Sequence, residues 1–320
     1  FDSNEFFNKR SGRDIPPFRM NQYGFALGGP VKRNRTFFFA DLQGTKWRKG
    51  DVFIASLPTA EQRAGDFSQT LTAANQRIVV YDPQTTRDNP AAAGRLLRDV
   101  FPNNLIPTSR LNPIALKMQS YFPAPNTVGS PLTQANNFVS NAPRKIDQAN
   151  FSGRGDHNVS QSHRLFGRFS VMRSTIFQPD SFNNAATSGT GANGNLNLYN
   201  YTAAVDNTIT LSPSTIVNVR YGFARFYWGR PTRSFGFDQT ALGFPASLVS
   251  QFQFPLFPTV NIEGFASMAG SSVLFTGQDT HSLLGSLTRI MGSHSLKMGF
   301  DGRLRRMNRN SVTGGGGRYN

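Results

Sequence analysis

The stretch whose spacing most closely fits a known chemical motif is "GTGANG", at Gly189–Gly194. The pattern G-x-G-x-x-G cradles a dinucleotide pyrophosphate when it follows a strand, opens a helix and precedes an acid by about 20 residues. Here the flanking sequences are "NNAATS" and "NLNLYN", which are small polar residues typical of a loop. We therefore predict a flexible extracellular loop at this position and no nucleotide site.

Metal and nucleophile chemistry also lack the residue spacings that they need. The four histidines form no i, i+4 pair and no H-E-x-x-H sequence. They are His157, His163, His281 and His294. The 320 residues include no cysteine and no G-x-S-x-G nucleophile motif. We predict no catalytic, cofactor-binding or metal-binding residue and no enzymatic activity, and the sequence does not assign ligand-binding residues.

Two aspartates in polar stretches are the remaining candidates for acid chemistry. Asp66 lies in "AGDFS" and Asp82 lies in "YDP". Short carboxylate side chains in such contexts typically accept hydrogen bonds from backbone amides two residues further on. We interpret both as turn-forming residues of loops and not as catalytic acids.

The net charge of +16 raises the question of nucleic-acid binding. It arises from 34 Lys and Arg against 18 Asp and Glu, yet charged residues make up only 16% of the chain. A typical value is about 25%, so the excess reflects scarce acids rather than abundant bases. The sequence contains no Lys/Arg run of the kind that marks a nucleic-acid patch. We predict no nucleic-acid partner.

The composition favours strands over helices. The sequence has 30 Gly and 19 Pro, which disfavour helices, and 29 Phe and 8 Tyr, which favour strands. It has no run of about 18 apolar residues that would predict a transmembrane helix. The chain begins with Phe1 and ends in "TGGGGRYN", so we expect it to be a piece of a longer protein. The predicted fold class is all-β.

Alternation of apolar and polar residues predicts eight strands of about 10 to 14 residues, longer than the usual 5 to 6. The clearest are "IVNVRYGFARFY" and "SLKMGFDGRLR". In the second, Leu296, Met298, Phe300 and Leu304 alternate with charged residues and glycines, a pattern suited to a strand with lipid on one side and water on the other. The eight segments are Phe18–Gly29, Thr36–Arg48, Asp147–Val159, Arg164–Ser174, Leu198–Leu211, Ile216–Tyr227, Thr280–Ile290 and Ser295–Arg305.

The connections between these segments alternate strictly between short and long. The short ones are Pro30–Arg35, Ser160–His163, Ser212–Thr215 and Met291–His294, and the long ones are residues 49–146, 175–197 and 229–279. Loops above about 12 to 15 residues are uncommon in compact domains. Tight periplasmic turns and long extracellular loops are the pattern of outer-membrane barrels. We predict a transmembrane antiparallel β-barrel with long extracellular loops.

Three consecutive phenylalanines follow the first turn. Phe38 shares a face with Ala40 and Leu42, which places it toward lipid in an aromatic girdle. Phe37 and Phe39 then point into the lumen, where a plug inside the barrel would cover them. The alternative is a β-sandwich strand that is buried on both faces.

Basic residues recur on the predicted lumen face, where a filled lumen must satisfy their charge. We expect them to pair with plug carboxylates, with attraction of anionic solutes as the alternative. They are Arg220, Lys297, Arg303 and Arg305.

A short helix is predicted inside the longest loop, over Asn112–Phe122. Asn112 can cap its start and Pro113 suits the first helical position. Two roles stay open for this helix: a lid that contacts ligand, or a stabilising segment that folds back over the barrel rim.

Several blocks closely resemble the Oar-like TonB-dependent outer-membrane transporters. "FRMNQYGFALGGPVKRNRTFFFADLQG" is similar to the first barrel hairpin of this family, and "LPTAEQRAGDFS" and "NNLIPTSRLNPIALKMQSYFPAPN" are similar to segments of its first long loop. "HRLFGRFS", "TALGFPASL" and "GSHSLKMGFDGR" also match, in the expected order. The resemblance covers nearly the whole chain.

The resemblance implies a location in the outer membrane and uptake of an unidentified extracellular solute. Residues 1–17 would end a plug domain, and residues 18–320 would form the first part of a barrel of about 22 strands, of which about eight are present. A TonB box and a carboxypeptidase-regulatory-like domain would lie upstream. The implied partners are membrane lipid, lipopolysaccharide and an inner-membrane TonB-type energy transducer.

Two other functions remain open on the sequence alone. One is a non-energised outer-membrane surface protein or adhesin on the same scaffold. The other is a soluble β-sandwich that binds polysaccharide. We also expect that eight strands cut from a larger sheet do not fold alone, because they leave two unpaired edges.

Overall fold

The computed structural model describes residue 15 and residues 17–270 and 272–320. The predicted end of a plug domain, residues 1–17, therefore lies outside the described residues except for Ile15 and Pro17. Among the described residues, no helix is long and apolar enough to cross a membrane.

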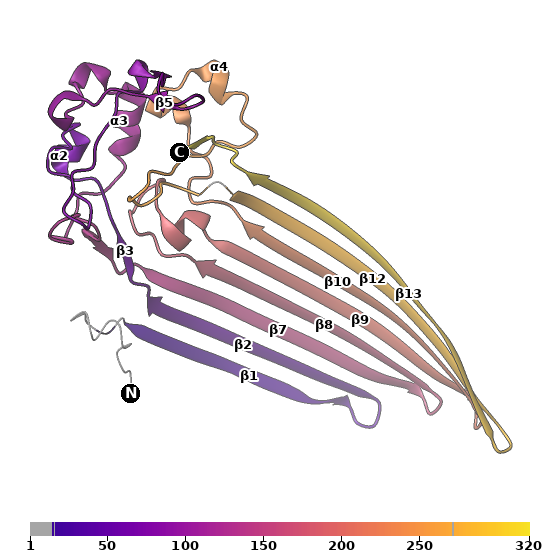
Figure 1. Ribbon diagram of the computed structural model, residues 1–320. Helices are drawn as coiled ribbons and strands as arrows, with labels where there is room; N and C mark the ends of the chain where they lie inside the picture. Colours follow the sequence, from indigo (N-terminus) through magenta and orange to yellow (C-terminus); the bar gives the residue numbers. More distant parts are fainter. Residues whose placement is uncertain (1–14, 16, 271) are drawn as a thin grey trace.

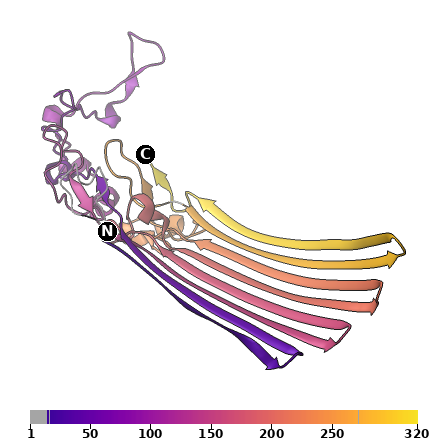
Figure 2. The same ribbon diagram turned by 90° about the horizontal axis from the view of Figure 1, so that it is seen from below.

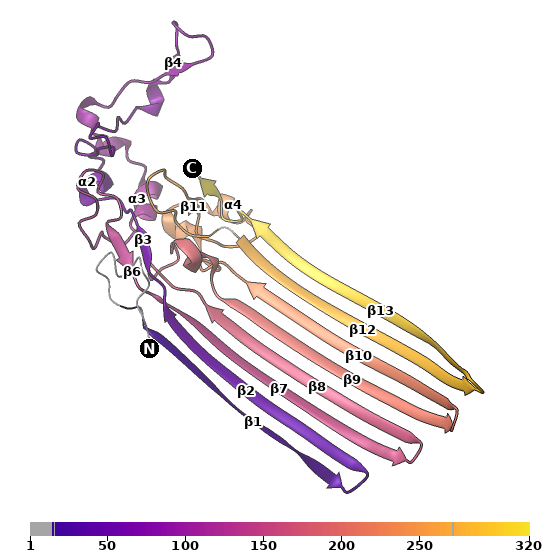
Figure 3. The same cartoon turned by 60° about the horizontal axis from the view of Figure 1, so that its bottom comes forward.

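Eight long strands form one antiparallel sheet in which each strand pairs with the next long strand of the chain. Figures 1 and 3 show them side by side from β1 to β13. The strands are β1 (Phe18–Lys32), β2 (Thr36–Gly50), β7 (Pro143–Ser160), β8 (His163–Phe177), β9 (Leu196–Ser212), β10 (Thr215–Arg230), β12 (Ser272–Met291) and β13 (His294–Thr313). The sheet is open: within the described residues, β1 and β13 each have a long-strand partner on one side only.

All eight predicted strands are present and longer than predicted. The long connections are correspondingly shorter, at residues 51–142, 178–195 and 231–271. The third loop, predicted as 229–279, differs most because β12 begins at Ser272. Consecutive apolar residues, Val273 and Leu274, are both buried there, so this part of the strand lacks the alternation that marks the rest.

The four turns at one end of the sheet are tight. Three of them have two residues outside the strands, and the first has three, residues 33–35. Gly292 has φ +60° and Asn34 has φ 59°, the left-handed conformation that these residue types tolerate best. These turns hold neighbouring strands in register along their whole length.

The long loops gather at the other end of the sheet (Figure 2). We call this assembly the loop cap, residues 51–142, 178–195, 231–270 and 314–320. Its helices are α2 (Ala60–Arg63), α3 (Pro113–Gln119) and α4 (Ala246–Val249), with 3₁₀ turns at Pro83–Thr85, Pro102–Asn104, Thr108–Arg110, Gly189–Asn193 and Gln239–Leu242. Its short strands are β3 (Phe53–Ala55), β4 (Arg87–Asp88), β5 (Leu96–Leu97), β6 (Phe138–Ser140), β11 (Thr259–Val260) and β14 (Arg318–Tyr319).

The loop cap has a hydrophobic core to which all three long loops contribute. Phe182 of the second loop packs edge-on against Phe122 and Phe138 of the first, with ring centroids 5.9 and 5.7 Å apart. Leu242 and Met268 of the third loop complete the cluster and are each 1% exposed. The three loops therefore form one packed unit.

The glycine-rich end of the chain is also part of the loop cap. β14 pairs in parallel with β11 of the third loop. Gly316 packs so closely that a Cβ there would lie 2.8 Å from Cβ of Leu256. The Gln239 side chain donates to the carbonyl oxygens of Leu256 and Gly316, at 2.8 and 2.7 Å. Glycine is therefore required at position 316 by close approach.

Candidate functional site

One face of the long sheet is apolar across its width. Because directly paired residues share a face, the register places Phe25 beside Leu42, Tyr221 beside Leu283 and Gly285 beside Phe300. Along β13 the apolar side chains run from Leu296 to Leu304, about 27 Å at about 3.4 Å per residue. At a tilt of about 40° this covers roughly 21 Å of depth, close to the apolar band of outer-membrane barrels.

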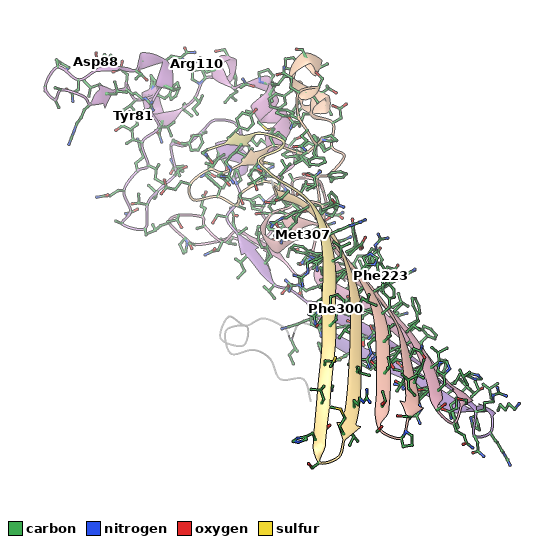
Figure 4. All side chains as sticks on the ribbon, turned by 90° about the vertical axis from the view of Figure 1, so that its right-hand side faces the viewer. Tyr81, Asp88, Arg110, Phe223, Phe300 and Met307 are labelled. Carbon is green, nitrogen blue, oxygen red and sulfur yellow. The ribbon has the colours of Figure 1, made fainter. Side chains whose placement is uncertain are left out.

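The opposite face is polar. On this face, strand pairing aligns Gln43 with Asn150, Ser170 with Thr202, and Thr280 with Arg305. Figure 4 shows Phe300 and Met307 on β13 and Phe223 on β10. Phe300 and Met307 are 307 − 300 = 7 positions apart along β13, an odd interval, so these two large apolar residues stand on opposite faces of the strand. The two-sided pattern predicted from the alternation is confirmed in the sheet.

The three phenylalanines follow the predicted faces. Phe38 pairs with Gly29 on the apolar face, whereas Phe37 and Phe39 pair with Pro30 and Gly28 on the polar face. On their other side, Phe37 and Phe39 are paired with Asp156 and Arg154 of β7. A hollow of about 560 Å³ adjoins these residues.

A buried carboxylate organises the polar face. Asp206 is only 4% exposed. Its carboxylate accepts from Nε of Arg220 at 2.6 Å, from Nδ2 of Asn218 at 2.9 Å and from Oγ1 of Thr208 at 3.2 Å. The Arg220 guanidinium also lies 5.8 Å from the ring centroid of Phe166. The hydrogen bonds of this network join β9 and β10, and the contact of Arg220 with the Phe166 ring extends it to β8.

The predicted lumen cations differ in their partners. Arg220 pairs with Asp206, and Arg303 pairs with Asp301 at 3.0 Å. The sheet itself supplies the carboxylates for these two arginines. The prediction that they pair with plug carboxylates is therefore wrong for Arg220 and Arg303. Lys297 and Arg305 form no ion pair with any residue that the structure describes. Asp301 and Arg303 are two residues apart on the same strand, so their side chains share a face and can form this ion pair.

A cleft of about 320 Å³ opens in the loop cap between the first and third loops. Its apolar walls come from Leu57, Phe67 and Ile78 of the first loop and Phe265 of the third. Glu263 lies at the exposed rim. Clefts of this volume with apolar walls and a few polar groups are typical of small-molecule sites.

Hydrogen bonds of helix α2 hold one wall of the cleft in place. Helix α2 carries Gln62, whose Oε1 accepts from the amide of Thr59 at 3.0 Å and whose Nε2 donates to Oγ1 of Thr70 at 3.1 Å. The first contact is half of a capping box at the start of α2. The "PTAEQ" sequence contains this signal, although its contribution to a cleft cannot be predicted from the sequence.

Both aspartates singled out in the sequence form the predicted turns. Asp66 accepts from the amide of Ser68 at 2.9 Å, and Asp82 accepts from the amide of Gln84 at 2.9 Å. Hydrogen bonds from Ser68 lower the pKa of Asp66 below its ordinary value. Neither aspartate lines the cleft.

Asp82 has a second partner that was not predicted. The guanidinium of Arg110 donates to both carboxylate oxygens, at 2.6 and 2.9 Å, and lies 5.6 Å from the ring centroid of Phe101. The bond from Arg110 is the main cause that lowers the pKa of Asp82, and the amide of Gln84 adds to it. This pair ties together the base of residues 69–111, which we call the distal arm and which project away from the sheet (Figure 3).

The other predicted features occupy ordinary structural positions. Gly189–Asn193 is a 3₁₀ turn within the second loop, as predicted for a loop, but it is packed into the cap, where Ala192 is buried. Three histidines hydrogen-bond neighbouring strands: His157 contacts Thr36, His163 contacts Asn207 and His281 contacts Tyr221. Among the described residues, no group of three His, Asp or Glu side chains could hold a metal.

The predicted helix in the first loop is present as α3. The Asn112 side chain accepts from the amides of Ile114 and Ala115, at 2.8 and 3.3 Å. Ile114 and Met118 pack against the cap core. This packing favours the stabilising segment over the ligand-binding lid.

A sheet with one apolar and one polar face, tight turns at one end and long loops at the other defines a β-sheet membrane protein. The sequence matches the family model of the outer membrane beta barrel domain over residues 1–320, and the chain belongs to that family. It is therefore an outer-membrane protein. No curated protein matches the sequence significantly.

Proposed function

We propose that this chain is part of a TonB-dependent transporter that takes up a solute across the outer membrane. The observation that carries the proposal is the convergence of three long loops into one packed cap with a small cleft. Its resemblance to the Oar-like transporters points the same way. The proposal assigns capture and transport, with no catalytic step.

In the proposed mechanism, the cleft between Leu57, Ile78 and Phe265 captures a small solute with apolar character. Further strands pair with the edges of β1 and β13 and close the barrel. A plug fills the lumen, covers Phe37 and Phe39, and supplies carboxylates to the cations that the sheet leaves without an ion pair. An inner-membrane transducer then moves the plug and releases the solute inward.

The test compares a wild-type strain with a strain lacking the full gene, each with and without a protonophore. Untargeted analysis of the spent medium identifies solutes that only energised wild-type cells remove. A solute whose removal requires both the gene and the proton gradient supports the proposal. Identical media from all four cultures would refute it.

A matched pair of variants links uptake to the cleft. Ile78 lines the cleft, whereas its neighbour Val79 does not, and their exposed fractions are 43% and 42%. We expect Ile78→Asn to reduce uptake of the identified solute and Val79→Asn to leave it unchanged. Equal uptake by both variants would place capture elsewhere.

The alternative proposal is a non-energised surface protein or adhesin on the same scaffold. It is favoured by apolar side chains on the distal arm: Tyr81 is 51% exposed, Leu96 61% and Val100 48%. Figure 4 shows Tyr81 and Arg110 within this arm, remote from the strands that carry Phe300. Loss of surface attachment in the deletion strain, with unchanged medium composition, would support this alternative.

A further inference from the structure

A cluster of arginines and tyrosines lies on the apolar face of the sheet, at the end nearer the loop cap. We call it the Arg–Tyr cluster. Its members are Arg173, Tyr199, Tyr201, Arg225, Tyr227 and Arg306, and they line a hollow of about 520 Å³.

Strand register brings these residues together from neighbouring strands. Arg173 of β8 pairs with Tyr199 of β9, and Tyr201 pairs with Arg225 of β10. In the strand register, Asp279 of β12 lies directly opposite Arg225 of β10 on one side and Arg306 of β13 on the other. The tyrosines stand between Arg173 and Arg306, which are four strands apart. At about 4.8 Å per strand, this separation is about 19 Å.

The cluster carries net positive charge. Its three arginines face one carboxylate, Asp279, so its formal charge is 3 − 1 = +2. Arg225 uses this carboxylate in a bidentate pair, with both N···O distances at 2.7 Å. Arg173 and Arg306 form no hydrogen bond or ion pair with any residue that the structure describes. Arg173 and Arg306 therefore have no ion pair of their own among the described residues, and the carboxylate beside Arg306, that of Asp279, is already bound by Arg225.

The depth of the cluster fits the outer-leaflet headgroups. Arg225 lies two residues beyond Phe223, and Arg306 lies two residues beyond Leu304, in each case toward the loop cap. Two residues correspond to about 7 Å along a strand. The cluster therefore borders the apolar band, at the level where aromatic girdles occur. In the outer membrane this leaflet consists of anionic glycolipid.

We propose that the Arg–Tyr cluster binds the phosphate groups of lipopolysaccharide, in its lipid A part. Arginine forms bidentate, charge-assisted hydrogen bonds with phosphate. Cations at both ends of a tyrosine-lined surface suit a disaccharide with a phosphate at each end. Tyrosine rings cover the sugar and the upper acyl chains and keep the hydroxyl at the wet boundary. This inference rests on the outer-membrane location and is independent of the proposed uptake.

The test uses the purified full-length protein in detergent. Native mass spectrometry measures binding of diphosphoryl lipid A, of monophosphoryl lipid A and of the fully dephosphorylated lipid. We expect each phosphate removed to weaken binding about tenfold or more, the effect of losing one charge-assisted contact. Equal binding of all three lipids would overturn the proposal. Displacement of diphosphoryl lipid A by an equal concentration of inorganic phosphate would also overturn it, because the site would then select free phosphate.

A matched pair of double variants tests the assignment to this face. Arg173→Gln with Arg306→Gln removes the two cations that lack an ion pair and should weaken diphosphoryl lipid A binding at least about tenfold. Arg168→Gln with Arg305→Gln makes the same change on the same two strands, but on the polar face, and should leave binding unchanged. Heat-modifiable mobility on a detergent gel confirms that each variant is folded. Folded double variants with equal affinity would refute the assignment.

Discussion

At the scale of single residues, Asp206 is the carboxylate on which the polar face depends most. Its removal would leave Arg220, Asn218 and Thr208 without their shared acceptor. We expect Asp206→Ala to lower the free energy of unfolding by about 1–3 kcal/mol. The measurement is the temperature at which the full-length protein loses its folded mobility on a detergent gel.

Asp301→Ala is the control for this prediction. Asp301 also pairs with an arginine, but its side chain is 46% exposed and that of Arg303 is 63% exposed. Exposed pairs contribute little, about 0–1 kcal/mol. If both variants lose folded mobility at the same temperature, the Asp206 network has no special role.

The Asp82–Arg110 pair predicts acid sensitivity of the distal arm. The pKa of Asp82 in the folded protein is lowered, chiefly by Arg110. The ion pair therefore stabilises the distal arm fully only at pH values above the unfolded pKa of about 3.9. The contribution is lost as the pH falls below that value toward the folded pKa. We therefore expect pepsin to cleave residues 69–111 faster at about pH 2.5 than at about pH 4.5, which lie on the order of one unit either side of 3.9. Pepsin is active across this range.

Arg110→Gln supplies the comparison for the acid prediction. This variant loses the ion pair at every pH, so the distal arm should be cut readily at both pH values. An unaltered ratio of cleavage rates in the variant would show that other groups cause the sensitivity. The turn around Asp82 could be predicted from the sequence, because its partner Gln84 is two residues away. Arg110 could not, because it is 28 residues further along the chain and only the folded arm brings it close.

At the scale of elements, the two faces of β13 predict opposite responses to a charge. Phe300 and Met307 have similar exposed fractions in the isolated chain, 62% and 60%, but stand on opposite faces. Phe300→Arg places a cation against the membrane interior and should destabilise the protein by about 2–4 kcal/mol. Met307→Arg adds a cation to the polar face and should cost much less.

The yield of heat-modifiable protein in the outer-membrane fraction measures this difference. A lower yield for Phe300→Arg than for Met307→Arg is expected. The reverse order would mean that the polar face, not the apolar one, meets lipid. The faces could be predicted from the sequence because a strand alternates with a period of two residues, whatever its neighbours are.

Phe182 holds the loop cap together, since its ring contacts Phe53, Phe122 and Phe138. We expect Phe182→Ala to destabilise the cap by about 3–5 kcal/mol and to expose the long loops to protease on intact cells. Leu96→Ala is the control, because Leu96 is 61% exposed and makes no core contact. Equal protease resistance of the two variants would contradict a shared core.

This core could not be predicted from the sequence. The long loops have no alternation or helical periodicity over most of their length, and their buried residues occur singly or in short runs, such as residues 256–259, with no repeating spacing. Local signals mark only short pieces of the loops: α3, the capping box at the start of α2, and the turns at Asp66 and Asp82. The cleft forms between segments about 200 residues apart, so its lining depends on tertiary packing that no short pattern encodes.

At the scale of the whole molecule, the open sheet predicts that residues 1–320 do not fold alone. The edges of β1 and β13 each present a row of backbone groups that needs a partner, above all within lipid. We expect the full-length protein to give an outer-membrane band whose mobility shifts on boiling. The isolated segment should aggregate and show no shift. A monomeric, heat-modifiable segment would show instead that these eight strands close on themselves.

Because outer-membrane barrels carry their long loops on the outside, the shared core of the loop cap bears on what an antibody or a bacteriophage recognises. Leu57 and Met268 lie 211 positions apart in the sequence and meet in one cluster. An antibody against the cap surface therefore recognises a discontinuous epitope assembled from several loops. Exchange of any one loop disturbs the other two, so antigenic variation is easiest at the tip of the distal arm around β4 and β5, which neither the core cluster nor the cleft includes.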